Sequence, residues 1–405
     1  MTKLQDLISD TERAAVRAPI EQARTLPRRA FLSDRFYQFE VEHVLQPSWM
    51  AVVFSSQLPN AGDVFPVTAL DCPMLFTRDD GGNVHAFHNV VPYDSSEVCI
   101  EARHNCKTII TPYHGWEYGL DGKLLAANYW DGTAGAASLH LGDMKADLIL
   151  IPCEEWFGTL FVYLGDQVTD FYADNRAVLE HFKDLDLNRL TIGLDGDGAP
   201  SIRHLPIGSN WKTVYENYAP NVYHESFVHA IYRKSPHSPR VDGGRNKTYT
   251  EINDPSGFLG LCYDNSIAAS FYGESELPPL CMKDGSPNIT NTISNMFPNW
   301  VTTVLGNVAR IAFFLPDGPE SGTQHLATFF DVDAADKDAF VKERERSVRV
   351  GVIAREEDNR ICESIQRARH SPALNAQFYS PFWDAMHYTL SNLVLDRLER
   401  SEASD

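Results

Sequence analysis

Between residues 49 and 165 the sequence breaks into short β-type runs, and this feature restricts the possible folds more than any other. The runs are rich in β-branched and aromatic residues, and turn signals such as Pro59-Asn60 and Asp121-Gly122 separate them. Many short strands at close spacing predict a small all-β unit. The predicted strands cover residues 50–54, 64–68, 74–78, 84–88, 108–111 and 158–164.

Helical patterns and longer strands flank this unit on both sides. Apolar residues recurring at Phe36, Phe39 and Val44 predict an amphipathic helix. A chain of 405 residues also favours two structural units. We therefore expect a β unit at residues 45–165, inserted into a second domain formed by residues 1–44 and 166–405. In that domain, helices are predicted at 211–230, 335–369 and 382–400, and strands at 301–305, 309–315 and 325–332.

The composition argues against several classes of function. The formal net charge of −20 disfavours non-specific nucleic-acid binding and docking on anionic lipid. No apolar run approaches the roughly 18 residues of a membrane span, and the N-terminus lacks the apolar stretch of a signal peptide. The seven cysteines form no C-x-x-C pair and argue against a disulfide framework. We expect a cytoplasmic protein with neither a nucleic-acid nor a membrane partner.

Two histidines, His224 and His229, lie close together in a segment rich in aromatic side chains. Imidazole and carboxylate together suit ferrous iron, and a set of two histidines and one carboxylate leaves one face open for O₂ and substrate. The five residues from one histidine to the other turn an ideal helix through about 140°. His229 must therefore lie at or beyond a helix end to share a metal with His224. The spacing alone is weak evidence, because two buried structural histidines also explain it.

The residues around the histidines carry a more specific signal. They include Asn210-Trp211-Lys212, then Glu216-Asn217, then Tyr223 before His224. This string resembles the N-W-K…E-N…Y-H…H signature of the Rieske-type ring-hydroxylating and N-demethylating oxygenases. The resemblance implies a mononuclear Fe(2+) site at His224 and His229 and a homotrimer. It also implies an α+β fold, with a small antiparallel β Rieske-like domain and a helix-grip, START-like catalytic domain that contains an antiparallel sheet.

The third iron ligand of this family is an aspartate in a late helix. Here the corresponding acidic string is Glu356-Glu357-Asp358, followed by Cys362-Glu363 and Gln366. The resemblance makes Asp358 the predicted carboxylate ligand. Glu357 and Asp384 are the alternatives, and an exposed helix carboxylate without a metal also fits the string.

The cluster positions of the family hold unexpected residues in this chain. A Rieske centre binds [2Fe–2S] through two thiolates and two imidazoles. At the spacing of the family, the ligand positions here are Val91, Tyr93, Thr111 and His114. Valine has no donor atom, and hydroxyl oxygens do not replace thiolates. The sequence therefore predicts that the [2Fe–2S] cluster is absent.

The resemblance also indicates which residues surround the iron. The family has an acidic residue three positions before its first iron histidine, and Asn221 occupies that position here. Asn221 and Tyr218 are the predicted catalytic residues. An apolar pocket is expected beside the metal. Its candidate aromatic walls are Tyr218, Tyr223, Phe227, Tyr232, Phe297 and Trp300.

These features together predict a non-haem Fe(2+)-dependent oxygenase. Its partners would be O₂ and a small aromatic or amine-type organic substrate, and a separate reductase or ferredoxin could supply electrons. Three other possibilities stay open. An electron-rich substrate could supply all four electrons itself, or the metal acts as a Lewis acid without redox change. In the third, the chain is a non-catalytic or electron-dependent subunit that partners an intact Rieske oxygenase paralogue.

Overall fold

The structure is a computed structural model, and it describes residues 3–132, 144–219, 222–230, 249–264 and 275–400. The chain forms two compact units, Pro47–Val168 and Met1–Gln46 with Thr169–Asp405. The boundaries predicted for the β unit were 45 and 165. Among the described helices, none combines the length and the apolar character that crossing a bilayer requires.

The smaller unit, Pro47–Val168, consists of short antiparallel strands in three sheets. Its core is a cluster of buried side chains that includes Leu75, Phe87 and Trp116. Gly122 occupies the turn after Asp121 with a φ of 79°, and a Cβ atom there would collide with the Phe87 ring. Glycine at this turn thus allows the chain to pass close to the core. The sheets are β1 (Met50–Phe54)-β10 (Thr159–Val162)-β9 (Cys153–Trp156), β2 (Val64–Ala69)-β3 (Cys72–Arg78)-β4 (Val84–His88)-β8 (Leu150–Ile151), and β5 (Ile109–Ile110)-β6 (Glu117–Tyr118)-β7 (Leu124–Ala126).

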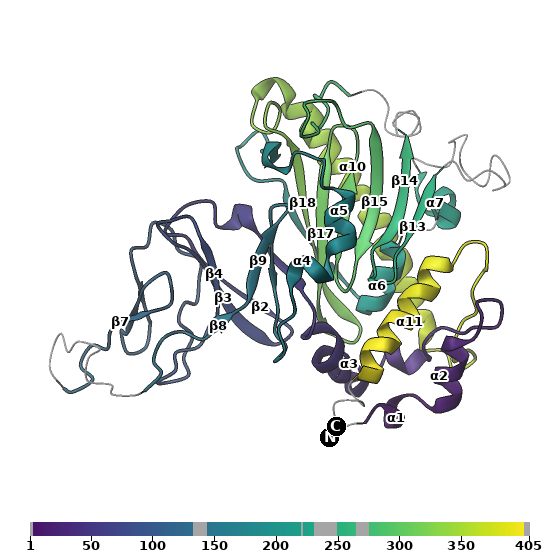
Figure 1. Ribbon diagram of the computed structural model, residues 1–405, viewed down its shortest axis with the longest axis horizontal. Helices are drawn as coiled ribbons and strands as arrows, with labels where there is room; N and C mark the ends of the chain where they lie inside the picture. Colours follow the sequence, from purple (N-terminus) through teal and green to yellow (C-terminus); the bar gives the residue numbers. More distant parts are fainter. Residues whose placement is uncertain (1–2, 133–143, 220–221, 231–248, 265–274, 401–405) are drawn as a thin grey trace. The chain divides into compact units, whose positions relative to one another are not determined.

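The larger unit is built on an 8-stranded antiparallel sheet. The strand order is β11-β18-β17-β16-β15-β14-β13, and β12 also pairs with β18. Figure 1 shows these strands side by side, with helix α10 along the sheet. Their bounds are β11 Leu190–Ile192, β12 Ile202–Ile207, β13 Thr250–Asn253, β14 Leu259–Asp264, β15 Thr290–Met296, β16 Trp300–Val304, β17 Ala309–Gly318 and β18 Ser321–Asp331.

Helices cover both faces of this sheet. On one face, the amide of Gln324 on β18 donates to Asn359 of α10 (Val341–Arg369) at 2.8 Å. On the other face, His181 of α5 (Arg176–His181) contacts the Thr292 hydroxyl of β15 at 3.0 Å. Among the residues that the structure describes, the remaining α-helices of this unit are α1 (Leu4–Leu7), α2 (Asp10–Arg17), α3 (Asp34–Glu40), α4 (Phe171–Asp174), α6 (Trp211–Tyr218), α7 (Val222–Val228) and α11 (Ala385–Arg400).

The predicted α+β architecture, with one small antiparallel β unit and one sheet-rich unit, is confirmed. Three predicted helices differ from the structure, and the last of them, predicted at 382–400, is α11 from Ala385 to Arg400. Helix α10 starts at Val341 rather than 335, because a 3-10 turn at Asp338–Phe340 precedes it. The predicted helix at 211–230 is wrong as a single element, since α6 ends at Tyr218 and α7 starts at Val222.

Candidate metal centre and its cavity

Helix α6 precedes the two histidines in the chain, and the residues at its two ends determine where it begins and stops. The N-cap Asn210 accepts a hydrogen bond from the Lys212 backbone N–H at 3.0 Å. At the other end, Ala219 is extended, with φ −70° and ψ 100°. The next residue in the sequence is Pro220, and proline disfavours a helical conformation in the residue before it. The segment predicted as one long helix is therefore two helices, and the break separates α6 from α7, the helix that carries His224.

A buried ion pair anchors the start of α6. The Lys212 ammonium lies 2.7 Å from each carboxylate oxygen of Glu40, and the Trp211 indole N–H donates to the same carboxylate at 3.0 Å. Burial raises the pKa of Glu40 and lowers that of Lys212, and the opposite charge of the partner opposes each shift. Because Glu40 belongs to α3, this pair fixes α6 to the N-terminal segment.

The two predicted iron histidines lie on either side of a helix end. His224 is inside α7, and His229 follows one residue after the helix ends at Val228. Their ring centroids are 5.8 Å apart. His229 must lie beyond a helix end for the two imidazoles to face one point, and the structure places it there.

Asp358, from the middle of α10, completes the group. Its Oδ1 lies 3.2 Å from Nε2 of His229 and 3.8 Å from Nε2 of His224. The three ligand atoms all lie within 4.8 Å of one another, and within the described part of the chain these residues form the one group of three or more His, Cys, Asp or Glu side chains suited to a metal. Asp358 and His229 are buried and His224 is partly exposed. This donor set and spacing fit a ferrous ion.

The alternative carboxylates occupy other positions. Oε2 of Glu357 lies 3.0 Å from Nδ1 of His229, on the side of the ring away from Asp358. Asp384 accepts a hydrogen bond from the Ser380 N–H at 2.7 Å and pairs with His387 at 3.4 Å. Neither belongs to the group of three ligand atoms. The Asn217 amide donates to Oδ1 of Asp358 at 3.3 Å, so the Asp358 carboxylate also has a supporting contact.

A cavity of about 290 Å³ opens beside the three ligands. The sheet contributes Ile293, Thr303 and Arg310, which lie side by side on β15, β16 and β17. Helix α10 forms another wall and contributes Gly351 and Arg355. The histidines, Asp358 and Tyr218 also line the cavity, whose size suits a small organic molecule.

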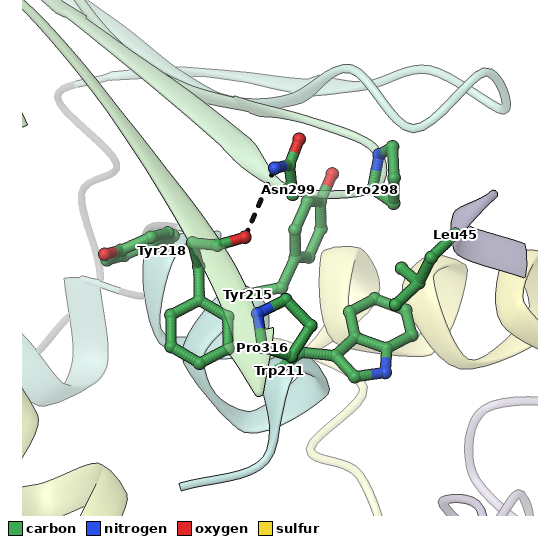
Figure 2. Close-up of a pocket in the computed structure, with 8 residues that line it drawn as sticks. Leu45, Trp211, Tyr215, Tyr218, Pro298, Asn299 and Pro316 are labelled. Atoms are coloured by element: carbon green, nitrogen blue, oxygen red, sulfur yellow. Dashed lines mark hydrogen bonds between the residues drawn. The ribbon is translucent and has the colours of Figure 1, made fainter. Parts of the chain in front are cut away.

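Tyr218, predicted to be catalytic, lines this cavity. Its buried hydroxyl makes no hydrogen bond to any residue that the structure describes, and burial raises its pKa, so the group stays protonated. The ring also borders a second, much smaller cavity of about 10 Å³ with Leu45 and Trp211. Figure 2 shows the Tyr218 ring at the edge of that group, with its hydroxyl directed away from Leu45 and Trp211.

Most of the predicted aromatic walls do not line the main cavity. Tyr223 and Phe227 are exposed, and Tyr223 stacks on Trp383 with the ring centroids 5.3 Å apart. Phe297 and Trp300 are buried elsewhere in the core. Asn221 and Tyr232, which we also predicted to lie at the site, fall outside the described residues.

The sequence analysis missed the arginines of the cavity. Arg310 lies in a strand whose neighbouring residues, Ala309 and Ile311, are fully buried. A charged residue inside an apolar strand is uncommon without a partner or a function, and this signal could have identified it. Arg355 could not be distinguished from the other charged residues of α10, because that helix is charged along most of its length.

The smaller unit has its own arrangement at the positions predicted for cluster ligands. Val91 is buried, and Tyr93 stacks on Trp116 with the ring centroids 5.0 Å apart. The Thr111 hydroxyl accepts a hydrogen bond from the Trp116 N–H at 3.0 Å, and His114 lies 2.5 Å from Asp94.

Both parts of the chain match known protein families. Residues 194–399 match the family described as the ring hydroxylating alpha subunit (catalytic domain). Residues 48–134 match the Rieske [2Fe-2S] domain. The resemblance stated from the sequence motifs is thus confirmed over most of the chain.

Curated relatives are oxygenases. Chloroplastic choline monooxygenase of Arabidopsis thaliana is 26% identical over 375 residues, which is 91% of this chain and 82% of the relative. The oxygenase subunit of glycine betaine monooxygenase from Chromohalobacter salexigens is 28% identical over 196 residues, which is 48% of this chain and 40% of the relative.

Solved structures share the fold. The quaternary ammonium Rieske monooxygenase CntA superposes with a TM-score of 0.72 at 17% identity, covering 95% of this chain and 97% of that chain. Naphthalene 1,2-dioxygenase from Rhodococcus sp. superposes with a TM-score of 0.70 at 16% identity, covering 93% and 95%.

These matches correct one prediction. We expected the [2Fe–2S] cluster to be absent, but the match of residues 48–134 is to the domain that carries this cluster in its family, and it contradicts that expectation. The expectation rested on single positions, whereas the match extends over the domain. The side chains of Val91, Tyr93 and Thr111 contain neither a thiolate nor an imidazole. The ligand positions taken from the family spacing therefore do not show which residues of the domain would bind the cluster.

Proposed function

The chain belongs to the family of ring-hydroxylating oxygenase alpha subunits, and on that premise we propose that it is an oxygenase whose mononuclear non-haem iron is held by His224, His229 and Asp358. The observation that carries this proposal is the convergence of one imidazole nitrogen from each histidine and one carboxylate oxygen within 4.8 Å of one another beside a cavity. Ferrous iron in such a set retains open positions for O₂ and substrate.

The residues around the ligands have separate tasks in this proposal. Glu357 accepts the Nδ1–H of His229, which fixes the ring and its tautomer with Nε2 toward the metal. Asn217 holds Asp358 through Oδ1. Tyr218 contributes to the cavity wall, and its neutral hydroxyl is a buried donor and acceptor without a hydrogen-bond partner among the described residues.

For the substrate, we propose a small organic amine with a quaternary or tertiary nitrogen. The curated relatives are named for choline and for glycine betaine, which supports this class. The reaction would consume O₂ and electrons from a separate reductase or ferredoxin, and we expect a homotrimer. The alternative of a non-catalytic subunit is not favoured, because these relatives are oxygenases or oxygenase subunits.

The test is iron binding by the triad. The full chain is loaded anaerobically with Fe(II), and iron is counted per chain for the wild type, Asp358→Asn and the control Glu356→Gln, which removes an exposed charge of the same helix. We expect the wild type and the control to hold about one mononuclear iron, as one facial triad requires. Asp358→Asn should lose it while keeping its thermal unfolding temperature. Equal iron content in Asp358→Asn and the wild type would show that the metal is elsewhere.

A further inference from the structure

Arg310 is a buried arginine in the wall of the cavity beside the triad. It projects from β17, which is otherwise apolar around it, and its side chain and backbone together are only 8% exposed. In the sheet it pairs with Thr303 of β16, and both residues line the cavity. A guanidinium keeps its charge in a protein and carries five N–H donors, so its position affects which ligands the cavity accepts.

Helix α10 is shaped to hold this guanidinium. Nη2 of Arg310 donates to the Ser347 carbonyl at 2.9 Å and contacts the Ser347 hydroxyl at 3.0 Å. One turn further along, a Cβ atom added to Gly351 would lie 2.8 Å from Nε of Arg310. A glycine inside a helix is less favourable than alanine by about 1 kcal/mol. The glycine at position 351 therefore lowers the local stability of the helix and leaves space for the Arg310 guanidinium.

Apart from the metal ligands and Glu357, the charged groups in the described walls of the cavity are two arginines. Arg310 and Arg355 both line it, and apart from the two histidines Tyr218 is the one aromatic side chain among the described lining residues. The Arg355 guanidinium carbon lies 4.1 Å from the centre of the Tyr218 ring, so this ring already has a cation on its face. A purely cationic ligand would meet two positive charges here, whereas an anionic group would be attracted.

The acidic groups of the cavity are at the metal ligands. Asp358 is one of those ligands, and Glu357 pairs with His229. A bound ferrous ion would offset the charge of Asp358, so the arginines are the charges that position a ligand, and a carboxylate held there would leave an amine at the other end of the molecule. This orientation would put the carbon atoms next to the nitrogen beside the triad.

We infer that Arg310 is a specificity-determining residue that binds a carboxylate of the substrate, so that the substrate is an amino-carboxylate of the betaine type rather than an amino alcohol. The inference rests on the proposed function, because it takes this cavity as the substrate site. The inference adds to the proposed function the chemical class of one substrate group, the one farthest from the metal. Arginine suits this task because its planar N–H groups pair with a carboxylate in two parallel hydrogen bonds.

The experiment compares matched pairs of ligands that differ only in this charge. γ-Butyrobetaine and its primary amide share a length and a quaternary nitrogen, and 4-phenylbutyrate and its primary amide repeat the comparison without the cation. Dissociation constants are measured by calorimetry on the full, anaerobic protein for the wild type, Arg310→Gln, Arg310→Lys, Gly351→Ala and Arg349→Gln. Arg349 is an exposed arginine of the same helix and controls for the loss of one positive charge.

The wild type and Arg349→Gln should bind the carboxylate of at least one pair roughly 10-fold or more tightly than its amide, the usual strength of a charge-assisted hydrogen bond. Arg310→Gln should reduce this preference to near unity while leaving the affinity for the amide within about threefold. Gly351→Ala should weaken the preference without removing the charge, because its Cβ displaces the guanidinium. Arg310→Lys keeps the positive charge and should retain part of the carboxylate preference. This variant therefore controls for the effect of replacing Arg310 on folding.

Two results would overturn the inference: a wild type without a carboxylate preference in either pair, or an Arg310→Gln variant that keeps the wild-type preference. These readouts need neither iron nor turnover. A protein that prefers carboxylates through Arg310 but binds no iron would contradict the proposed oxygenase activity alone. An iron-loaded, active enzyme whose preference ignores Arg310 would contradict this inference alone.

Discussion

Nδ1 of His229 lies 3.0 Å from Oε2 of Glu357, so the carboxylate fixes the imidazole from behind and leaves Nε2 for a metal. Substituting Glu357 by alanine should lower the affinity for iron by about 10- to 100-fold, the usual effect of losing such an orienting partner. Glu357→Gln keeps a hydrogen-bond acceptor and should lose less. A competitive Fe(II) titration measures this, with Glu356→Ala as the exposed neighbour. Equal losses in Glu356→Ala and Glu357→Ala would show that only the charge of the helix matters.

The Tyr218 hydroxyl should be dispensable for folding. It is buried without a hydrogen-bond partner among the described residues, so Tyr218→Phe should leave the free energy of unfolding unchanged or raise it by up to about 1 kcal/mol. Iron content should be unchanged, because the hydroxyl is not one of the three ligand atoms. Tyr215→Phe is the matched control, because that hydroxyl donates to the Gly257 carbonyl at 2.8 Å and its loss should cost about 1 kcal/mol. Urea unfolding of the two variants gives the comparison, and a Tyr218→Phe variant less stable than Tyr215→Phe would refute it.

The buried pair of Lys212 and Glu40 should tolerate joint replacement better than the loss of one partner. Lys212→Met leaves the Glu40 carboxylate buried without its cation and should lower the free energy of unfolding by about 3–5 kcal/mol. The double variant Glu40→Gln, Lys212→Met keeps an acceptor for the Trp211 indole and should recover most of that loss. Denaturant unfolding of the single and double variants measures the coupling. Additive losses would mean that the two side chains do not interact.

His325 should make the fold sensitive to moderate acid. Burial, followed by the neighbouring His204, lowers the pKa of His325 from 6.5 to about 4. The unfolded chain therefore takes up this proton first, so the stability is fully present above pH 6.5 and is lost as the pH falls toward 4. Replacing His325 by glutamine should flatten the fall in stability between pH 7 and pH 5, as measured by urea unfolding at the two values. An unchanged slope would assign the acid sensitivity to other groups.

The iron ligands could be predicted from the sequence because their neighbours form a local string. Asn210 to His229 is short enough to be compared residue by residue, and the structure brings both histidines to Asp358 as the string suggests. The break between α6 and α7 was also visible in principle, since Pro220 precedes α7 in the sequence.

The cavity wall could not be predicted in this way. Arg310 reaches the site through strand pairing, and Gly351 through the packing of α10 against the sheet. Both contacts join residues far apart in the chain, and no periodicity in the sequence specifies them. The cluster prediction failed for a related reason, because it judged a domain of residues 48–134 by a few ligand positions.

Helix α10 carries both Gly351, beside Arg310, and Asp358, at the triad. Seven residues of an α-helix make almost two full turns and advance by about 10 Å, so the two points share one face at a fixed separation. The distance between these two points would thus select ligands by their length, in addition to the selection by charge at Arg310. A single residue inserted between the two points would turn one of them away by about 100°. Relatives that accept longer or shorter molecules should therefore differ in the wall residues of the cavity and keep the register of this helix.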